Sequence, residues 1–185
     1  MAKEKKQPIF IEPGFRFEEV DTIYILPAVD LMVNKDKEPE KRLQAVDFEA
    51  PRCVQGRGYR TVPEKVKGKQ DPPPIRMSVS EDDLKEPQDA WVRKLGPDDA
   101  HWVFVLALED ASSHLTFGST GKAIVMGTVF DRQTGKLVWR AVGTAQAGQG
   151  GLMGMAMKGA MTDEAIGEAV LDVCKMIEKR SGKKK

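Results

Sequence analysis

The stretch from His101 to Gln146 constrains the fold more than any other part of this 185-residue chain. Apolar residues run without interruption from Trp102 to Leu108, which indicates a central strand that is buried on both faces. A second apolar run covers Lys122 to Phe130, and alternating residues from Lys136 to Ala145 indicate a third strand. The sequence therefore predicts three consecutive strands that form a meander.

The connectors of this meander differ in how well they are specified. The segment DRQTG, Asp131 to Gly135, predicts a tight turn, because an aspartate can accept bonds from backbone donors and a glycine can adopt positive φ. Residues 112–121 are polar and contain glycine, so we expect a loop there. In the third strand, the alternation predicts that Leu137 and Trp139 share the buried face. Lys136 and Arg140 then lie on the wetter face, where they solubilise the strand or rim an interface.

The rest of the chain alternates helices with shorter strands. Pro27 should stop or bend the first strand, and Pro87 should break the second helix, because proline removes a backbone donor. Ser80 and Asp83 are spaced to cap that second helix, and Thr162 can cap the last. The predicted elements are a strand at 22–29, a helix at 39–49 with a short turn to Gln55, a strand at 59–62, a helix at 80–94, and a final helix from Thr162.

These elements predict one domain of the α/β (α+β) class. We expect a single mixed, largely antiparallel sheet of about five strands with helices packed on it. The domain should occupy residues 19–180, with a Pro-rich loop at 64–77. An extended polar arm at 1–18 and a basic tail at 181–185 complete the chain.

The final helix carries the clearest amphipathic pattern, which predicts that it lies across the sheet. Cys174 falls on its apolar stripe, so a buried, unreactive thiol is the favoured interpretation, and a disulfide with Cys53 remains open. The stripe consists of Ile166, Ala169, Val170, Val173, Cys174 and Ile177.

Four motifs together resemble a family of bacterial lipoproteins. The hairpin motif GTVFDRQTGKLVWRAVG (127–143) is the most specific of them. The other three are ILPAVD (25–30), GYRTVP (58–63) and PDDAHWVFVLAL (97–108). The pattern is similar to outer-membrane and periplasmic lipoproteins related to the periplasmic domain of the curli-secretion lipoprotein, to the exopolysaccharide-export lipoproteins, and to the amino-terminal domain of the Tol β-propeller protein.

The resemblance implies a non-catalytic envelope protein that acts as a scaffold or assembly subunit in envelope transport or maintenance. Its expected partners are itself, other envelope proteins, and the membrane through a lipid anchor that this chain does not contain. We therefore expect a periplasmic, outer-membrane-anchored native form whose leader precedes this sequence. A cytoplasmic location is the alternative.

Composition and side-chain chemistry point to no reaction. The formal net charge is +1, so nothing favours nucleic acid as a partner. His101 and His114 have no cysteine or second histidine at ligand spacing, and we expect no metal and no cofactor. The segment Ser112-Ser113-His114 lies within one connector and not on a nucleophile elbow, so we expect no catalytic residues.

The passage from Ala147 to Met161 is rich in glycine and methionine. Methionine is common at adaptable binding surfaces, so Met153, Met155, Met157 and Met161 are candidates for a partner surface, with an ordinary buried turn as the alternative. The glycines Gly148, Gly150, Gly151 and Gly154 follow a strand and precede a helix, as a phosphate-binding loop would. Their spacing departs from G-x-G-x-x-G, and a small-ligand or nucleotide-binding module is therefore the alternative function.

Overall fold

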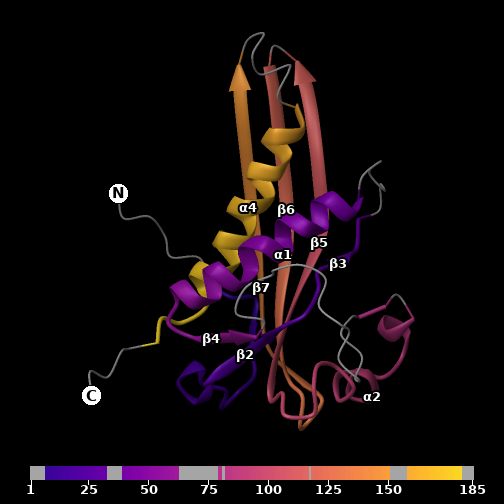
Figure 1. Ribbon diagram of the computed structural model, residues 1–185, viewed down its shortest axis with the longest axis vertical. Coiled ribbons are helices and arrows are strands. Elements are labelled where there is room, and N and C mark those ends of the chain that lie inside the picture. The colour runs from indigo at the N-terminus through magenta and orange to yellow at the C-terminus, as the bar shows by residue number, and fades with distance from the viewer. Residues whose placement is uncertain are drawn as a thin grey trace.

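A computed structural model describes residues 7–32, 39–62, 79–80, 82–116, 118–150 and 158–180 of the chain. These residues form a mixed sheet of seven strands with helices on both faces (Figure 1). The strands are β1 (Phe10–Ile11), β2 (Thr22–Ile25), β3 (Val29–Asp30), β4 (Arg60–Val62), β5 (Trp102–Thr116), β6 (Gly118–Asp131) and β7 (Lys136–Gly150). The predicted loop 64–77 and tail 181–185 lie outside the described residues.

The strand order is β1-β7-β6-β5-β2-β4, with β3 also paired to β5. The pairs β1–β7, β7–β6 and β6–β5 are antiparallel, and β2 and β3 run parallel to β5. The predicted fold class is confirmed. The strand count is seven rather than about five because Pro27 divides the first predicted strand into β2 and β3, and because the arm adds β1.

The three meander strands are longer than predicted. Strands β5 and β6 continue through the segment 112–121, where the sequence predicted a loop, and pair there up to Thr116 and Gly118. The prediction was wrong because the polar residues of this segment extend the sheet beyond its central apolar part. Together with β7, these strands form the long upper part of the molecule (Figure 1).

A bulge near the DRQTG turn changes which residues of β7 face the core. Val129 pairs with Trp139, but Phe130 pairs with Leu137, so that Val138 is the extra residue. Leu137 therefore packs with the cluster on the opposite face from Trp139, which corrects the predicted alternation. The turn itself is confirmed: the Asp131 carboxylate accepts the backbone N–H of Gln133 at 2.9 Å, and Gly135 has a φ of 75°.

Helices α1 (Pro39–Gly56) and α4 (Lys158–Met176) cover one face of the sheet (Figure 1). Helix α1 continues through Pro51, where the sequence predicted an interruption. Pro51 cannot donate a hydrogen bond to the backbone carbonyl of Asp47, and its ring crowds that carbonyl, but the helix continues. Helix α4 begins at Lys158, one turn before the predicted cap, so Thr162 lies inside it and is buried.

Glycines in the sheet allow α4 to approach closely. A Cβ atom on Gly121 would overlap the carbonyl oxygen of Met161, and one on Gly143 would overlap that of Ala169. The α4 backbone thus rests directly on β6 and β7. The predicted stripe of α4 is confirmed, because all six of its residues are buried in the larger hydrophobic cluster.

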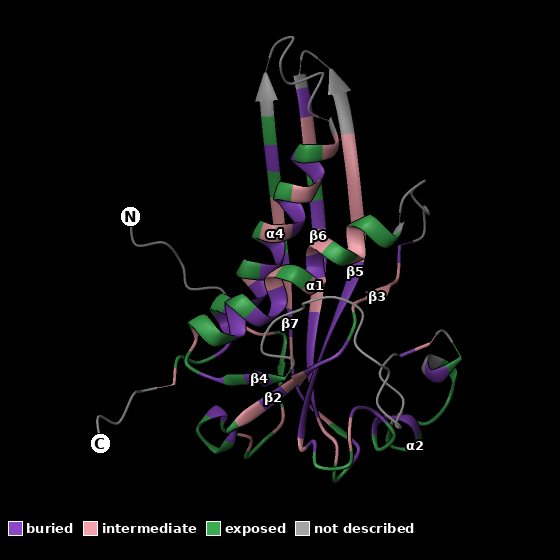
Figure 2. Cartoon of the chain, viewed as in Figure 1, coloured by how far each residue is buried: buried purple, intermediate pink, exposed green. Residues whose placement is uncertain are grey.

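Two hydrophobic clusters lie on opposite faces of the sheet, and Figure 2 shows the buried strands between them. The larger cluster, beneath α1 and α4, contains Trp139 and Phe104, both fully buried. The smaller cluster lies under the short helices η2 (Asp83–Lys85) and α2 (Gln88–Val92) and is centred on Trp91 and Phe130. We call these the helix face and the outer face.

The segment on the outer face follows the sequence prediction in part, because the described part of the predicted helix at 80–94 forms only η2 and the five-residue α2. Pro87 separates η2 from α2, as predicted. Before η2, the Ser80 backbone N–H donates to the Asp83 carboxylate at 2.5 Å, and the Asp83 N–H donates to the Ser80 hydroxyl at 3.3 Å. These are the bonds of a capping box, but they close the turn before η2, whose N-cap is Asp82 and has no side-chain capping bond. Ser80 is therefore not the cap of that helix.

Candidate functional site

The predicted glycine and methionine sites are only partly described. Gly148 lies within β7 opposite Thr120, and Gly150 ends that strand opposite Gly118, so both belong to a strand instead of the predicted loop. Gly151, Gly154, Met153, Met155 and Met157 lie outside the described residues. Met161 is only 7% exposed and contributes to the buried side of α4, so it packs within the molecule.

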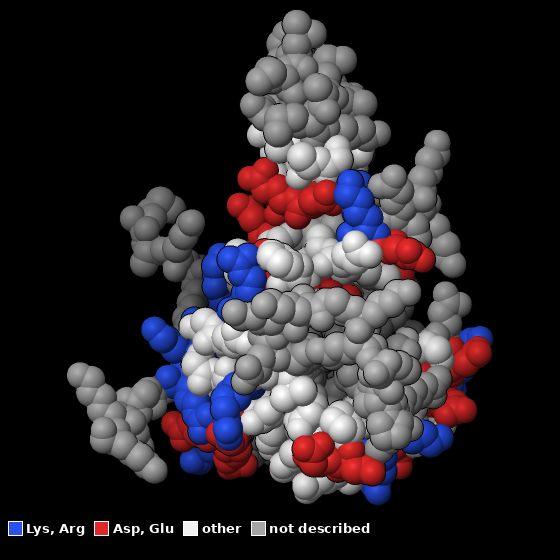
Figure 3. All heavy atoms as spheres, viewed as in Figure 1, with Lys and Arg blue, Asp and Glu red and all other residues white. Residues whose placement is uncertain are grey.

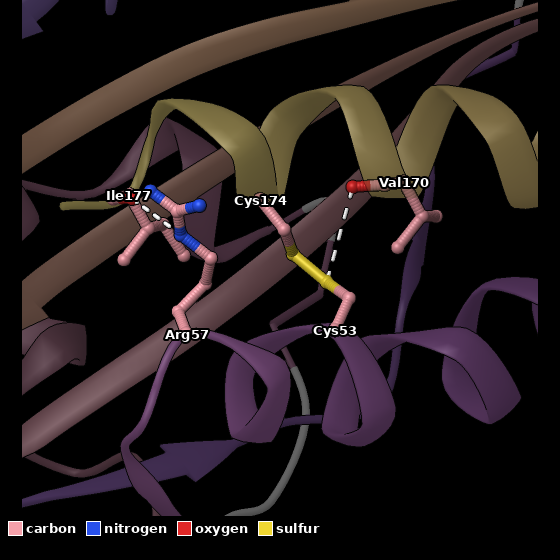
Figure 4. The surroundings of a disulfide bond; sticks show 5 residues. All are labelled: Cys53, Arg57, Val170, Cys174 and Ile177. Atoms are coloured by element: carbon pink, nitrogen blue, oxygen red, sulfur yellow. Dashed lines mark hydrogen bonds between the residues drawn. A yellow bond between two sulfur atoms is a disulfide. The ribbon is translucent and has the colours of Figure 1, made fainter. Parts of the chain in front are cut away.

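A disulfide joins Cys53 of α1 to Cys174 of α4 (Figure 4). The two Cα atoms are 6.0 Å apart, a separation that suits a disulfide. This pairing replaces the buried free thiol that the sequence favoured for Cys174. Proximity between positions 121 residues apart cannot be read from sequence spacing, which is why the alternative remained open.

Contacts on both sides of the disulfide hold the two helices together. The Cys53 Sγ atom lies 3.9 Å from the carbonyl oxygen of Val170, and the Arg57 Nε donates to the carbonyl oxygen of Ile177 at 2.8 Å (Figure 4). At the other end, the Arg42 guanidinium pairs with the Asp163 carboxylate. Helices α1 and α4 therefore form one covalently linked layer on the helix face of the sheet.

The outer face contains a hollow of about 220 Å³ beside the smaller hydrophobic cluster. Its lining is mainly apolar, and among the residues that the structure describes there, Arg140 is the cationic one. The lining residues are Val29, Leu31, Val79, Glu86, Gln88, Trp91, Val105, Ala107, Met126, Thr128, Phe130 and Arg140. An apolar hollow with a few polar groups is the usual form of a ligand site.

Arg140 is the electrostatic feature of this hollow. Its Nε donates to the Thr128 hydroxyl at 3.3 Å, and burial lowers the pKa of its guanidinium, while the carboxylate of Glu109 acts in the opposite direction. No carboxylate among the described residues forms an ion pair with it within 4.0 Å. Sequence analysis treated Arg140 as a solubilising or interface residue. Its half-buried position depends on strand register and neighbours that the sequence does not show.

The other candidates for chemistry are dispersed. The His101 ring stacks on Trp102 with 4.2 Å between ring centroids, and its Nε2 lies 3.3 Å from an Asp131 carboxylate oxygen. Ser112 and Ser113 are consecutive residues of β5 and therefore point to opposite faces of the sheet. Within the described ranges, no three histidine, cysteine, aspartate or glutamate side chains are grouped as metal ligands.

The carboxyl group of Asp47 in α1 has a raised pKa. Burial raises the pKa of its carboxyl group, whereas the hydrogen bond that its Oδ1 accepts from the Ala28 N–H at 2.7 Å lowers it. That bond secures the chain where it breaks between β2 and β3. Asp47 therefore has a structural role in holding the chain between β2 and β3.

In the described part of the chain, no helix is long and apolar enough to cross a membrane.

Comparison with known proteins identifies the fold. No family model matches the chain, and no curated protein matches its sequence. Among solved structures, the PelC dodecamer from Paraburkholderia phytofirmans is similar at 13% identity and a TM-score of 0.52, over 88% of this chain and 90% of that one. Lipoprotein GNA1162 from Neisseria meningitidis is similar at 12% identity and a TM-score of 0.47, over 78% and 98% respectively.

These structural neighbours include bacterial lipoproteins and a protein that forms dodecamers. Identities this low establish similarity of fold.

Proposed function

We propose that this protein is a non-catalytic subunit of the bacterial cell envelope, acting as a scaffold or assembly partner in envelope transport or maintenance. The observation that carries the proposal is the disulfide between α1 and α4. Disulfides persist in oxidising compartments such as the periplasm and are rare in the cytosol. A bond that joins the two main helices of the core supports an exported protein.

Two further observations support the proposal. The fold is similar to that of PelC, which is described as a dodecamer, and to that of a lipoprotein. The described side chains bring no nucleophile, base and stabilising donor together, so binding accounts for the molecule better than catalysis does. Self-association and binding to other envelope proteins are the activities that we assign to it.

Cell fractionation combined with thiol labelling tests the location. The protein, tagged at its carboxyl terminus, is expressed in its native bacterium, and free thiols are labelled with a maleimide polymer before and after reduction. We expect the protein in the envelope fraction, with a mass shift only after reduction. A Cys174→Ser variant is the control, because its Cys53 thiol should label without reduction. Recovery from the cytosol with both wild-type thiols labelled directly would overturn the proposal.

The hollow at Arg140 favours a second candidate function, the binding of a small anionic amphiphile. A carboxylate or phosphate can pair with the guanidinium, and an alkyl chain can contact Val105, Ala107 and Met126. This site is separate from the glycine segment that the sequence offered for ligand binding. It would serve a protein that handles lipids or lipid-linked molecules.

Decanoate and decanol test this candidate, because they share a chain length and differ in charge. Decanoate should raise the melting temperature and decanol should raise it less. The variant Arg140→Gln should lose the difference between them while keeping its fold. Equal effects of decanoate on the wild type and on the variant would exclude Arg140 as its binding group.

A further inference from the structure

The solvent side of α4 carries an ordered charge pattern. Glu164, Glu168, Leu171 and Lys175 follow one another at spacings of four, three and four residues and are all exposed, so they form one stripe along the helix. Lys179 follows just beyond the helix and lines the same hollow as Lys175. The stripe within α4 is acidic at Glu164 and Glu168 and basic at Lys175, and the exposed Glu178 and Lys179 follow beyond the end of the helix. Figure 3 shows acidic side chains gathered over the upper half of α4 and basic ones nearer its lower end.

An exposed apolar patch lies at the centre of this stripe. Leu171 is 41% exposed, and Phe48 of α1 is 59% exposed. Both line a shallow groove between the two helices, together with Ala45 and Gly167. Arg52 lies 5.3 Å from the centre of the Phe48 ring and covers part of it, but the patch remains open to solvent.

The charges of the stripe have few partners within the chain. Neither Glu164 nor Glu168 has an ion pair within 4.0 Å among the described residues, and the same is true of Lys175 and Lys179. Interaction with the helix dipole favours acidic residues in the first turn and basic residues in the last. It does not explain Glu168, which lies well inside the helix, or the exposure of Leu171 and Phe48.

We propose that this stripe is a self-association surface, in which α4 packs antiparallel against α4 of a second copy about a two-fold axis at Leu171. Such an axis places Glu168 opposite the partner's Lys175. It brings Glu164 near the segment that follows the partner's α4 and carries Lys179. It also brings the two apolar patches together at the centre. A two-fold interface uses the same surface on both copies, so the surface must be self-complementary. A stripe with acidic and basic halves on either side of a leucine has that property.

This inference rests on the proposed self-association and adds its location and its two-fold symmetry. A dimer formed in this way leaves the outer face and the sheet edges free. Further copies or other envelope proteins can therefore bind elsewhere on each dimer.

Charge-reversal variants test the surface by sedimentation velocity over a range of concentrations. The variant E164K/E168K makes the stripe wholly basic, and the variant K175E/K179E makes it wholly acidic. Each should repel its own kind, so we expect the dissociation constant of each to rise by at least about tenfold, since each change removes several exposed ion pairs. An equimolar mixture of the two should form a one-to-one heterodimer. The fourfold variant E164K/E168K/K175E/K179E should form homodimers again.

The melting temperature and circular dichroism spectrum of each variant should match those of the wild type. Any loss of dimers is then an effect on association and not on folding. The variant Leu171→Gln should weaken dimers without changing charge, and high salt should weaken those held by the ion pairs. Two results would contradict the proposal that this stripe is the self-association surface. One is wild-type association that both reversals leave intact, which would leave the proposed function standing. The other is a wild type that stays monomeric even when a terminal histidine tag tethers it to nickel-chelating vesicles. The location assay is independent of either result.

Discussion

The two faces of the sheet are built in different ways. On the helix face, α1 and α4 span most of the long strands, a disulfide joins them, and the α4 backbone lies against glycines. On the outer face, two short helices cover the smaller cluster and leave a hollow at Arg140. Covalent linkage and close backbone packing are therefore concentrated on the helix face. The other face has the room for a ligand.

Replacing a tryptophan on each face should give the largest difference. Trp139 of β7 is fully buried under α1 and α4, and Trp91, a residue of α2, is 5% exposed. Trp139→Ala should cost about 3–5 kcal/mol of unfolding free energy, because the covalently linked layer cannot collapse into the cavity. Trp91→Ala should cost less, about 2 kcal/mol, because the short α2 can shift. Urea unfolding measures both, and equal losses would mean that the two faces are equally rigid.

Removing the disulfide should weaken the helix face next. The double variant Cys53→Ser/Cys174→Ser should lose about 2–4 kcal/mol, because the cross-link restricts a long stretch of the unfolded chain. Denaturant unfolding under oxidising conditions measures the loss. A reductant should bring the wild type close to the variant and leave the variant unchanged. No loss on substitution would show that α1 and α4 need no covalent bond.

A methyl group at the contact between α4 and the sheet should have an intermediate effect. Gly143→Ala places a Cβ atom against the Ala169 carbonyl, so we expect a cost of about 1–3 kcal/mol. Gly159→Ala is the matched control in α4 itself, since nothing lies within 4 Å of its Cβ position. Thermal unfolding should separate the two variants. If Gly143→Ala behaves like its control, the helix does not rest tightly on β7.

The smallest effect should come from the buried carboxyl group of the helix face. The pKa of Asp47 is raised above its ordinary value of 3.8, so the folded state holds the proton more strongly than the unfolded state. The contribution of Asp47 to stability is therefore greatest at low pH and declines as pH rises from 3.8 through the raised value. Asp47→Asn keeps an acceptor for the Ala28 N–H and removes the charge. The variant should thus gain stability relative to the wild type as pH rises, which unfolding at several pH values measures. A constant difference would exclude titration of Asp47.

Local chemistry in the sequence predicted much of the fold. Pro27 and Pro87 interrupt their elements because the rule for proline is local, and Asp131 and Gly135 form the predicted turn for the same reason. The stripe of α4 was predictable because helical periodicity is regular. These features require only residues close together in sequence.

The features that were missed depend on distant contacts. Residues 112–121 read as a loop because they are polar, but they pair with β-strand neighbours that the local pattern does not specify. The bulge at Val138 reverses the face of Leu137, and no single residue in the sequence signals it. The disulfide requires α1 and α4 to lie side by side, which only the assembled sheet brings about. The charged residues of the α4 stripe can be read in the sequence, but their solvent exposure is seen in the structure.

The bond between Cys53 and Cys174 also changes the connectivity of the chain. It closes a covalent ring that contains β4, α2, the whole meander and most of α4. Everything before Cys53 and after Cys174 is a branch of that ring. A single peptide-bond cleavage anywhere within the ring therefore opens it without releasing a fragment. Under oxidising conditions, a protease must cut the ring twice, or cut one of its branches, before any part of the molecule can leave.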